Sequence, residues 1–156
     1  VALVVLSFTY PLIQAVFPTL VSFRDDKKRM RKIFMVWLAG ATACAALAMA
    51  LYIWLGPAML RRWLRNEEVA SVVYPVLLVL LIGTMLNVVY QVGYVRWMLD
   101  ANYKMPLIIS STSVVLTALL TPPLVMHYGI MGAATGWLLI NALGFLISCS
   151  RLLKIG

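Results

Sequence analysis

The sequence predicts an all-α membrane protein built as a bundle of five transmembrane helices, and two observations lead to that fold class. Of the 156 residues, 63% are hydrophobic and only 12% are charged. A soluble domain usually has a surface of which about a quarter or more is charged. The hydrophobic residues also gather into long uncharged segments, and about 20 helical residues are enough to cross a hydrocarbon core of about 30 Å.

Five segments of this kind are predicted to form a single transmembrane domain over residues 1–156. They cover approximately residues 1–22, 33–55, 72–95, 106–126 and 129–150. We expect all five to be helices, because backbone groups in lipid must be satisfied within the chain. The sequence starts with Val1 inside a hydrophobic run, so we expect it to be a fragment preceded by further helices of the same protein.

A cationic run separates the first two segments and predicts the orientation. Residues 24–32 carry six basic side chains, and Arg96, Lys104, Arg151 and Lys154 fall on the same side of the predicted membrane. The opposite side has three basic residues against ten. Basic loops are retained in the cytoplasm, so this run and the C-terminus are predicted to be cytoplasmic.

The first two segments contain prolines and small residues. Pro11 and Pro18 are expected to kink the first helix. Gly56 and Pro57 are expected to end the second, whose alanine-rich middle around Gly40 is typical of a buried packing helix.

The segment from Pro57 to Ser71 is predicted to form a short amphipathic helix in the outer interface, with Trp63 at headgroup depth. It carries three arginines, Arg61, Arg62 and Arg65. Two interpretations remain open for them, contact with lipid phosphates and contact with an anionic substrate at the outer exit.

The third segment begins with Pro75 in its expected first turn and is the most informative. Its polar residues recur every three or four positions and so share one helix face. They are Thr84, Asn87, Tyr90, Gln91 and Tyr94. Placing an amide against lipid is energetically costly, so this face either forms hydrogen bonds to a neighbouring helix or lines a transport path. Arg96 is placed at the inner mouth of that path, where it can pair with Asp100.

The fourth and fifth segments are expected to pack as a close hairpin. Ser110, Ser113, Thr117 and Thr121 line one face of the fourth, which Pro122 and Pro123 bend or end. A tight turn at residues 127–129 follows. Gly132 and Gly136 form a small-residue pair that Gly144 and Ser148 are expected to continue on the same side.

No enzyme, cofactor site or metal site is indicated. The predicted spans have no acidic or basic residue near their centres, and no ligand cluster, nucleophile arrangement or phosphate-binding loop has the required spacing. The net charge of +8 lies mostly in short loops, where membrane orientation explains it better than nucleic-acid binding does.

Three features together resemble a known family. They are the sequence Phe17, Pro18, Thr19 before the charged loop, the polar third segment leading to residues 99–104, and YGIMGAATG from Tyr128 to Gly136. They look like the C-terminal part of bacterial polysaccharide flippases in the multidrug, oligosaccharidyl-lipid and polysaccharide exporter superfamily. The resemblance implies that these helices form most of the second lobe of a two-lobe transporter.

The resemblance also implies a function. Such a protein in the bacterial cytoplasmic membrane would flip an isoprenoid-diphosphate-linked oligosaccharide to the outer leaflet, for O-antigen, capsule or exopolysaccharide synthesis. Its expected partners are the bilayer, this lipid-linked substrate, the missing N-terminal helices and the glycan polymerase machinery. Two alternatives stay open, a multidrug or small-solute exporter of the same superfamily and a non-transporting scaffold of glycan assembly.

Overall fold

The computed structural model describes residues 18–22 and 26–152. Four long helices follow one another: α2 (Lys27–Leu64), α3 (Glu67–Leu99), α4 (Lys104–Tyr128) and α5 (Ile130–Leu152). All four are long and apolar enough to cross a membrane. The prediction of an all-α membrane protein is therefore confirmed. Most of the first predicted span, residues 1–22, lies outside the described residues, apart from a helical stretch at 18–22.

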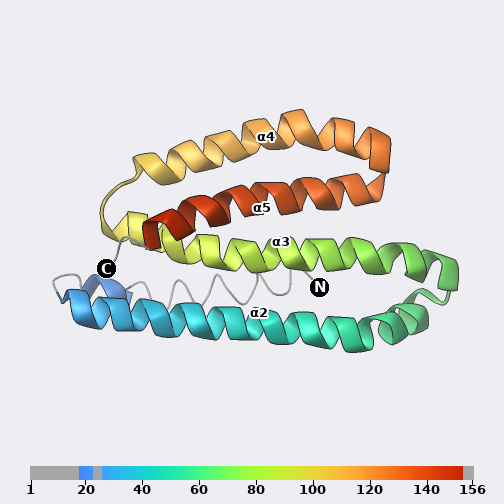
Figure 1. The fold of residues 1–156 in the computed structure, drawn as a ribbon, viewed down its shortest axis with the longest axis horizontal. Helices are drawn as coiled ribbons and strands as arrows, with labels where there is room; N and C mark the ends of the chain where they lie inside the picture. The colour runs from blue at the N-terminus through green and yellow to red at the C-terminus, as the bar shows by residue number, and fades with distance from the viewer. Residues whose placement is uncertain (1–17, 23–25, 153–156) are drawn as a thin grey trace.

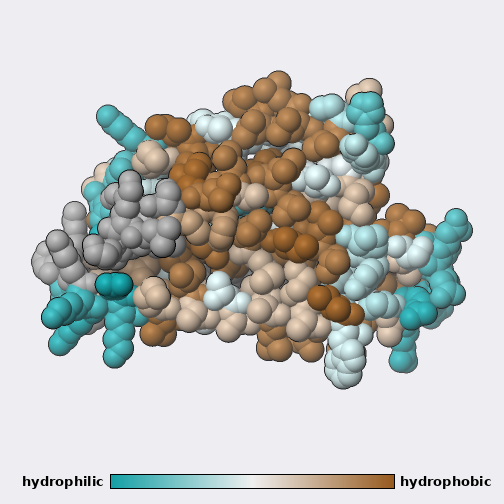
Figure 2. Space-filling view, viewed as in Figure 1, coloured by the Kyte–Doolittle hydropathy of each residue, from teal (hydrophilic) through white to brown (hydrophobic). Residues whose placement is uncertain are grey.

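The four helices lie side by side in one layer, in the order α2, α3, α5, α4 (Figure 1). α3 packs against α2 on one side and α5 on the other, and α4 packs mainly against α5. Hydrophilic side chains gather at both ends of the layer, with apolar side chains between them (Figure 2). The described helices thus form a wall whose broad faces suit lipid or further helices.

The hairpin of α2 and α3 is longer than that of α4 and α5, and its turn extends past theirs (Figure 1). Gly83 of α3 lies beside Trp137 of α5, which places the first residue of α5 about level with Val76. Since α3 starts at Glu67, it begins about 14 Å before α5 at a rise of about 1.5 Å per residue.

Short polar side chains start the two longest helices. The side chain of Asp26 accepts a hydrogen bond from the backbone of Arg29 at 3.0 Å, and that of Asn66 accepts one from Val69 at 3.1 Å. These bonds satisfy amide groups that have no partner inside the helix. Glu67 in the first turn of α3 adds a favourable interaction with the positive end of the helix dipole.

The predicted helix end at Pro57 is wrong, because α2 continues through this proline to Leu64. A buried cluster of Tyr52, Leu60, Ala70 and Leu81 holds this part of α2 against α3. Packing of this kind compensates for the backbone bond that a proline removes.

The predicted interfacial helix between Pro57 and Ser71 is wrong for the same reason. Those residues form the end of α2, a turn at Arg65 and Asn66, and the start of α3. Arg65 closes α2 in a left-handed conformation, with φ of 52°.

Prolines elsewhere also lie inside helices. Pro75 lies well within α3 rather than in its first turn, because α3 begins at Glu67. α4 likewise passes through Pro122 and Pro123 and ends at Tyr128. A membrane helix tolerates such a break in its hydrogen bonds because neighbouring helices can satisfy the freed backbone groups.

The alanine-rich middle of α2 is largely exposed among the described residues, contrary to the prediction, although Ala45 is buried. Gly40, Ala43 and Cys44 are exposed, and a Cβ atom added at Gly40 would meet nothing within 4 Å. The reason is the place of α2 at the edge of the layer, where α3 packs against one side of it and Leu20 of the stretch 18–22 contacts it only near its start.

The predicted hairpin of the last two helices is confirmed. Gly129 turns the chain with φ of 57°, and Gly132 brings α5 against the backbone of α4. A Cβ atom at Gly132 would collide with the carbonyl oxygen of Leu124, and one at Gly136 would lie 3.0 Å from the Thr121 hydroxyl.

Gly144 and Ser148 do not continue this contact. A Cβ atom at Gly144 would instead lie 3.1 Å from the Tyr90 ring of α3. Gly144 follows Gly136 by eight residues, which turns the helix about 80° past two full turns. The prediction that Gly144 and Ser148 share one side with Gly132 and Gly136 is therefore wrong.

Alanine at Gly132 is expected to destabilise the full-length protein strongly, because the added methyl group meets backbone that cannot rotate away. We expect a loss of about 1–3 kcal/mol, seen as a lower melting temperature in detergent. Gly40→Ala is the matched control: its methyl group enters open space, and alanine favours a helix over glycine by up to about 1 kcal/mol. Equal melting of both variants would contradict the close packing of α4 on α5.

Lys28 and Asn66 lie at opposite ends of the layer, because α2 runs its full length between them. Single cysteines at these positions, in a full-length background without Cys44 and Cys149, should therefore react differently with an impermeant maleimide on spheroplasts. The basic asymmetry predicts labelling at residue 66 and protection at residue 28. The reverse pattern would invert the predicted orientation, and equal labelling would contradict a membrane-spanning α2.

Candidate functional site

The candidate site is the polar face of α3, and the structure turns most of it toward α5. Thr84 is buried and donates a hydrogen bond to the carbonyl oxygen of Leu80 at 2.8 Å. Its hydroxyl is therefore satisfied within its own helix. Asn87, Tyr90, Gln91 and Tyr94 are half-buried along the next two turns.

Three amides form a hydrogen-bonded chain across the two helices. The Gln91 amide nitrogen donates to the Asn87 side-chain oxygen at 3.4 Å, and the Asn87 nitrogen donates to the Asn141 oxygen at 2.6 Å. Asn141 in turn donates to the carbonyl oxygen of Trp137 at 2.7 Å. The short bond between Asn87 and Asn141 anchors α3 to α5, and the bond from Asn141 to Trp137 lies within α5. The bond of Gln91 is long for an amide and correspondingly weak.

Glycines bring the two helices close enough for these bonds. A Cβ atom at Gly83 would lie 2.7 Å from the Trp137 ring, and one at Gly93 would lie 2.6 Å from the Ser148 hydroxyl. That hydroxyl donates to the carbonyl oxygen of Tyr90 at 3.3 Å. Small residues allow such close approach where no hydrophobic force drives helices together.

The two tyrosines extend the polar face toward the end of α3. The rings of Tyr90 and Tyr94 meet edge to face, with centroids 6.3 Å apart. Tyr90 also packs over Gly144 of α5. Together with Gln91, these rings form the half-exposed part of the candidate site.

Arg96 does not share this face. It follows Asn87 by nine residues, or two and a half turns, so it lies on the opposite side of the helix. Its guanidinium pairs with Asp100 at 3.3 Å, as predicted from their spacing, and contacts the sulfur of Met30 on α2 at 3.4 Å. Arg96 therefore joins α3 to α2 at the end of the layer.

The three predicted outer arginines lie at the turn between α2 and α3. Arg61 pairs with Glu67 at 3.3 Å and also donates to the carbonyl oxygen of Pro57. Arg62 and Arg65 are exposed and form no salt bridge with described residues. Glu67 and Asn87 are twenty residues apart on α3, about 30 Å, so these arginines and the amide chain are separate.

Asn141 was not predicted as a site residue, although an amide inside an apolar span is itself a signal of a polar partner. Its helix was interpreted from its glycines, and nothing local shows which neighbour an amide faces. Asn141 is only 5% exposed, and it links α5 to Asn87.

Comparison with family sequence models gives a match to the MatE family over residues 24–122, which is more than half of the chain. The chain belongs to the MatE family. Members of this multidrug and toxic compound extrusion family are transporters rather than enzymes, so this is a multi-pass membrane protein of an exporter and flippase superfamily. Comparisons with curated proteins and with solved structures give no match.

The bond between Asn87 and Asn141 is expected to show as a coupling in a double-mutant cycle of the full-length protein. Either Asn87→Leu or Asn141→Leu leaves one amide unsatisfied near the helix contact, which costs about 1–3 kcal/mol. The double variant should lose less than the sum, by about 0.6 kcal/mol and at most about 2. Melting in detergent measures this, and additive losses would contradict the bond.

Proposed function

We propose that this chain is part of a flippase that moves an isoprenoid-diphosphate-linked oligosaccharide from the inner to the outer leaflet of the bacterial cytoplasmic membrane. Membership of the MatE family supports the transport class. The finer substrate rests on the resemblance to polysaccharide flippases and on the polar face of α3. The product would serve the synthesis of O-antigen, capsule or exopolysaccharide, and the cationic run and C-terminus would face the cytoplasm.

The observation that carries this proposal is the free end of the amide chain. Asn87 and Asn141 satisfy each other, but Gln91 is half-buried and its side-chain oxygen has no hydrogen-bond partner among the described residues. An amide can donate and accept hydrogen bonds at once, as a sugar hydroxyl can. Gln91 beside Tyr94 therefore suits a path wetted by water and passed by a glycan.

The single layer of helices explains why further helices are needed. Transporters of this kind alternate access by moving one bundle against another around a central site. The described helices provide one wall, and in this proposal N-terminal helices of the same protein supply the opposite lobe. Glycan polymerase machinery would act on the flipped product.

A small-solute exporter of the same superfamily is the alternative within transport. Among the described residues, α3 has no charged side chain between Glu68 and Arg96, so it offers a solute no charged anchor at mid-membrane. A neutral, hydrogen-bonding wall suits the sugars of the proposed substrate, although it offers the diphosphate no cation either.

Gln91→Leu is expected to abolish most glycan export while leaving the fold intact, since only a 3.4 Å bond is lost within the protein. Export per folded molecule, with melting recorded in parallel, should fall at least tenfold at nearly unchanged melting temperature. Gln91→Asn should restore part of the export because it keeps an amide.

The matched control is Asn87→Leu, which breaks the helix contact and should lower stability more than export per folded molecule. Normal glycan export by the Gln91→Leu variant would contradict the proposal that α3 lines the glycan path. Normal drug export with no glycan export in the unmutated protein would favour the small-solute alternative.

A further inference from the structure

The contact between α3 and α5 offers α5 two equivalent positions along α3, one helical turn apart. We propose that the hairpin of α4 and α5 slides along α3 between these two registers, so that Asn141 leaves Asn87 and pairs with Gln91. A repeat in α3, an unpaired group in α5 and small residues between the two helices support this movement. It does not depend on the identity of the transported substrate.

α3 presents the same pair of side chains twice. Residues 87–90 have the sequence NVVY and residues 91–94 have the sequence QVGY, so in each copy a tyrosine follows an amide by three residues. Positions four residues apart on a helix lie about 6 Å apart along the axis and only about 40° apart around it. The two copies therefore face nearly the same side of α3, one turn apart.

α5 carries one set of groups that fits this repeat, and the structure places it against the first copy. α3 and α5 lie side by side and run in the same direction (Figure 1). Asn141 bonds to Asn87 at 2.6 Å, and a Cβ atom at Gly144 would lie 3.6 Å from the Cβ atom of Tyr90. A shift of α5 by four residues toward the end of α3 brings both groups to the second copy.

An unpaired group in α5 gains a partner in the shifted register. The indole N–H of Trp137 is buried and has no hydrogen-bond partner among the described residues, and a Cβ atom at Gly83 would lie 3.0 Å from its nitrogen. Buried polar groups are usually paired, so this exception needs an explanation. Trp137 precedes Asn141 by four residues, so the same shift places it opposite Asn87. The side-chain oxygen of Asn87 can accept its hydrogen bond.

Small residues allow close packing in both registers. In the described register a Cβ atom at Gly93 would lie 2.7 Å from that of Ser148, and in the shifted register Gly93 faces Gly144. The Ser148 hydroxyl donates to the carbonyl oxygen of Tyr90 at 3.3 Å, and after the shift it lies near that of Tyr94. The backbones therefore remain close, as membrane helices require for tight association.

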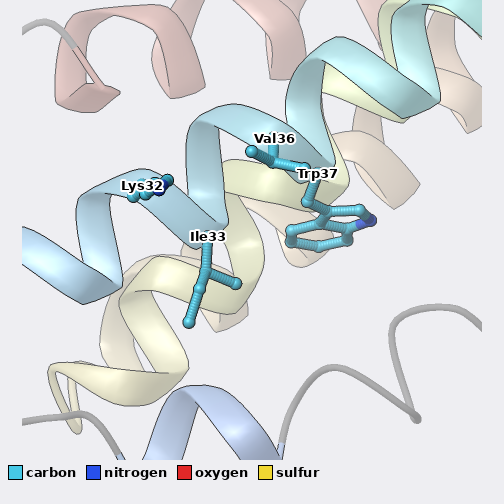
Figure 3. Close-up of a pocket in the computed structure, with 4 residues that line it drawn as sticks. All are labelled: Lys32, Ile33, Val36 and Trp37. Carbon is cyan, nitrogen blue, oxygen red and sulfur yellow. The ribbon is translucent and has the colours of Figure 1, made fainter.

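The hairpin of α2 and α3 is held together separately and forms one of the two bodies. Figure 3 shows Ile33 and Trp37 projecting to the same side of α2. Trp37 lies in a buried cluster with Val92 of α3, and Ile33 packs against that cluster. Further along the pair, the Tyr52 hydroxyl donates to the carbonyl oxygen of Tyr74 at 3.0 Å. These contacts stay unchanged when α5 moves.

The hairpin of α4 and α5 forms the other body, and its connection to α3 contains spare length. α4 packs mainly against α5, and the close approach at Gly132 joins them. The turn between α3 and α4 is coiled: the amide of Asn102 donates to the carbonyl oxygen of Trp97 at 2.9 Å, and Ala101 is left-handed with φ of 54°. An extended residue spans about 3.3–3.6 Å, so opening this turn supplies the length for a shift of about 6 Å.

The two registers differ in which amide of α3 is held by α5. In the described register Asn141 holds Asn87, and in the shifted register it holds Gln91. One-turn movements between packed helices give two discrete states rather than a continuous deformation. The shift would therefore open and close the Gln91 end of the polar face. This last consequence rests on the proposed function, whereas the shift itself does not.

Disulfide trapping in the full-length protein, in a background without native cysteines, distinguishes the registers. Tyr90→Cys with Gly144→Cys reports the described register, because Cβ atoms 3.6 Å apart suit a disulfide. Tyr94→Cys with Gly144→Cys reports the shifted register, and Leu86→Cys with Gly144→Cys reports a shift of one turn in the opposite direction. The last two variants also carry Tyr90→Ala, so that no ring opposes the new side chain at position 144.

Oxidation in native membranes without added substrate should crosslink the Tyr90 and Tyr94 pairs, and the Leu86 pair roughly tenfold more slowly than the Tyr94 pair. Equal rates for the Tyr94 and Leu86 pairs would indicate diffuse mobility. No crosslink in the Tyr94 pair would indicate a single register. Either result would overturn the proposal. Since transport is not measured, failure of the glycan proposal would leave these rates unchanged.

A further variant tests whether the second amide holds the shifted register. Gln91→Leu should slow crosslinking of the Tyr94 pair about fivefold, as expected for loss of one hydrogen bond, and leave the Tyr90 pair nearly unchanged. Thr84→Val is the matched control on the same face of α3. The Thr84 hydroxyl is bonded within its own helix, so this change should alter neither rate. Equal slowing by both variants, or none by Gln91→Leu, would overturn the pairing of Gln91 with Asn141.

Discussion

The contact between α3 and α5 is the constraint on which the rest of the structure depends. The two helices are separated in sequence by all of α4, yet they pack more extensively than any other pair of described helices. Glycines such as Gly83 and Gly93 let the backbones approach, and the bond between Asn87 and Asn141 fixes their register. In lipid there is little hydrophobic force between helices, so such packing and hydrogen bonding hold them together.

This contact also determines which polar groups remain for function. Asn87 and Asn141 are occupied with each other, and Thr84 is bonded to its own helix. Gln91 and Tyr94 lie at the half-exposed margin of the contact. The two interpretations of the polar face are thus divided along α3: interhelical contact near Asn87, and the proposed glycan path near Gln91.

The sequence predicted features that depend on the membrane as a solvent, because that solvent acts on every residue in the same way. The helical fold, the inward face of α3 and the close hairpin at Gly132 were all expected on this basis. The sequence did not predict features that depend on contact with one specific neighbouring residue. Packing of Tyr52 and Leu60 on α3 carries α2 past Pro57, and the partner of Asn87 lies fifty-four residues away.

The unequal helix lengths have a consequence for the outline of the protein in the bilayer. α2 has 38 residues and α5 has 23, which corresponds to about 57 Å and about 35 Å. Fitting all of α2 within the 40–45 Å of a whole bilayer would need a tilt of about 40°. The same tilt would shorten α5 in the packed layer to about 27 Å, less than the hydrocarbon core. At a smaller tilt α2 is longer than the bilayer is thick, so it extends beyond the headgroups. Because α3 starts well before α5, the turn with Trp63 and the neighbouring arginines projects beyond the turn between α4 and α5.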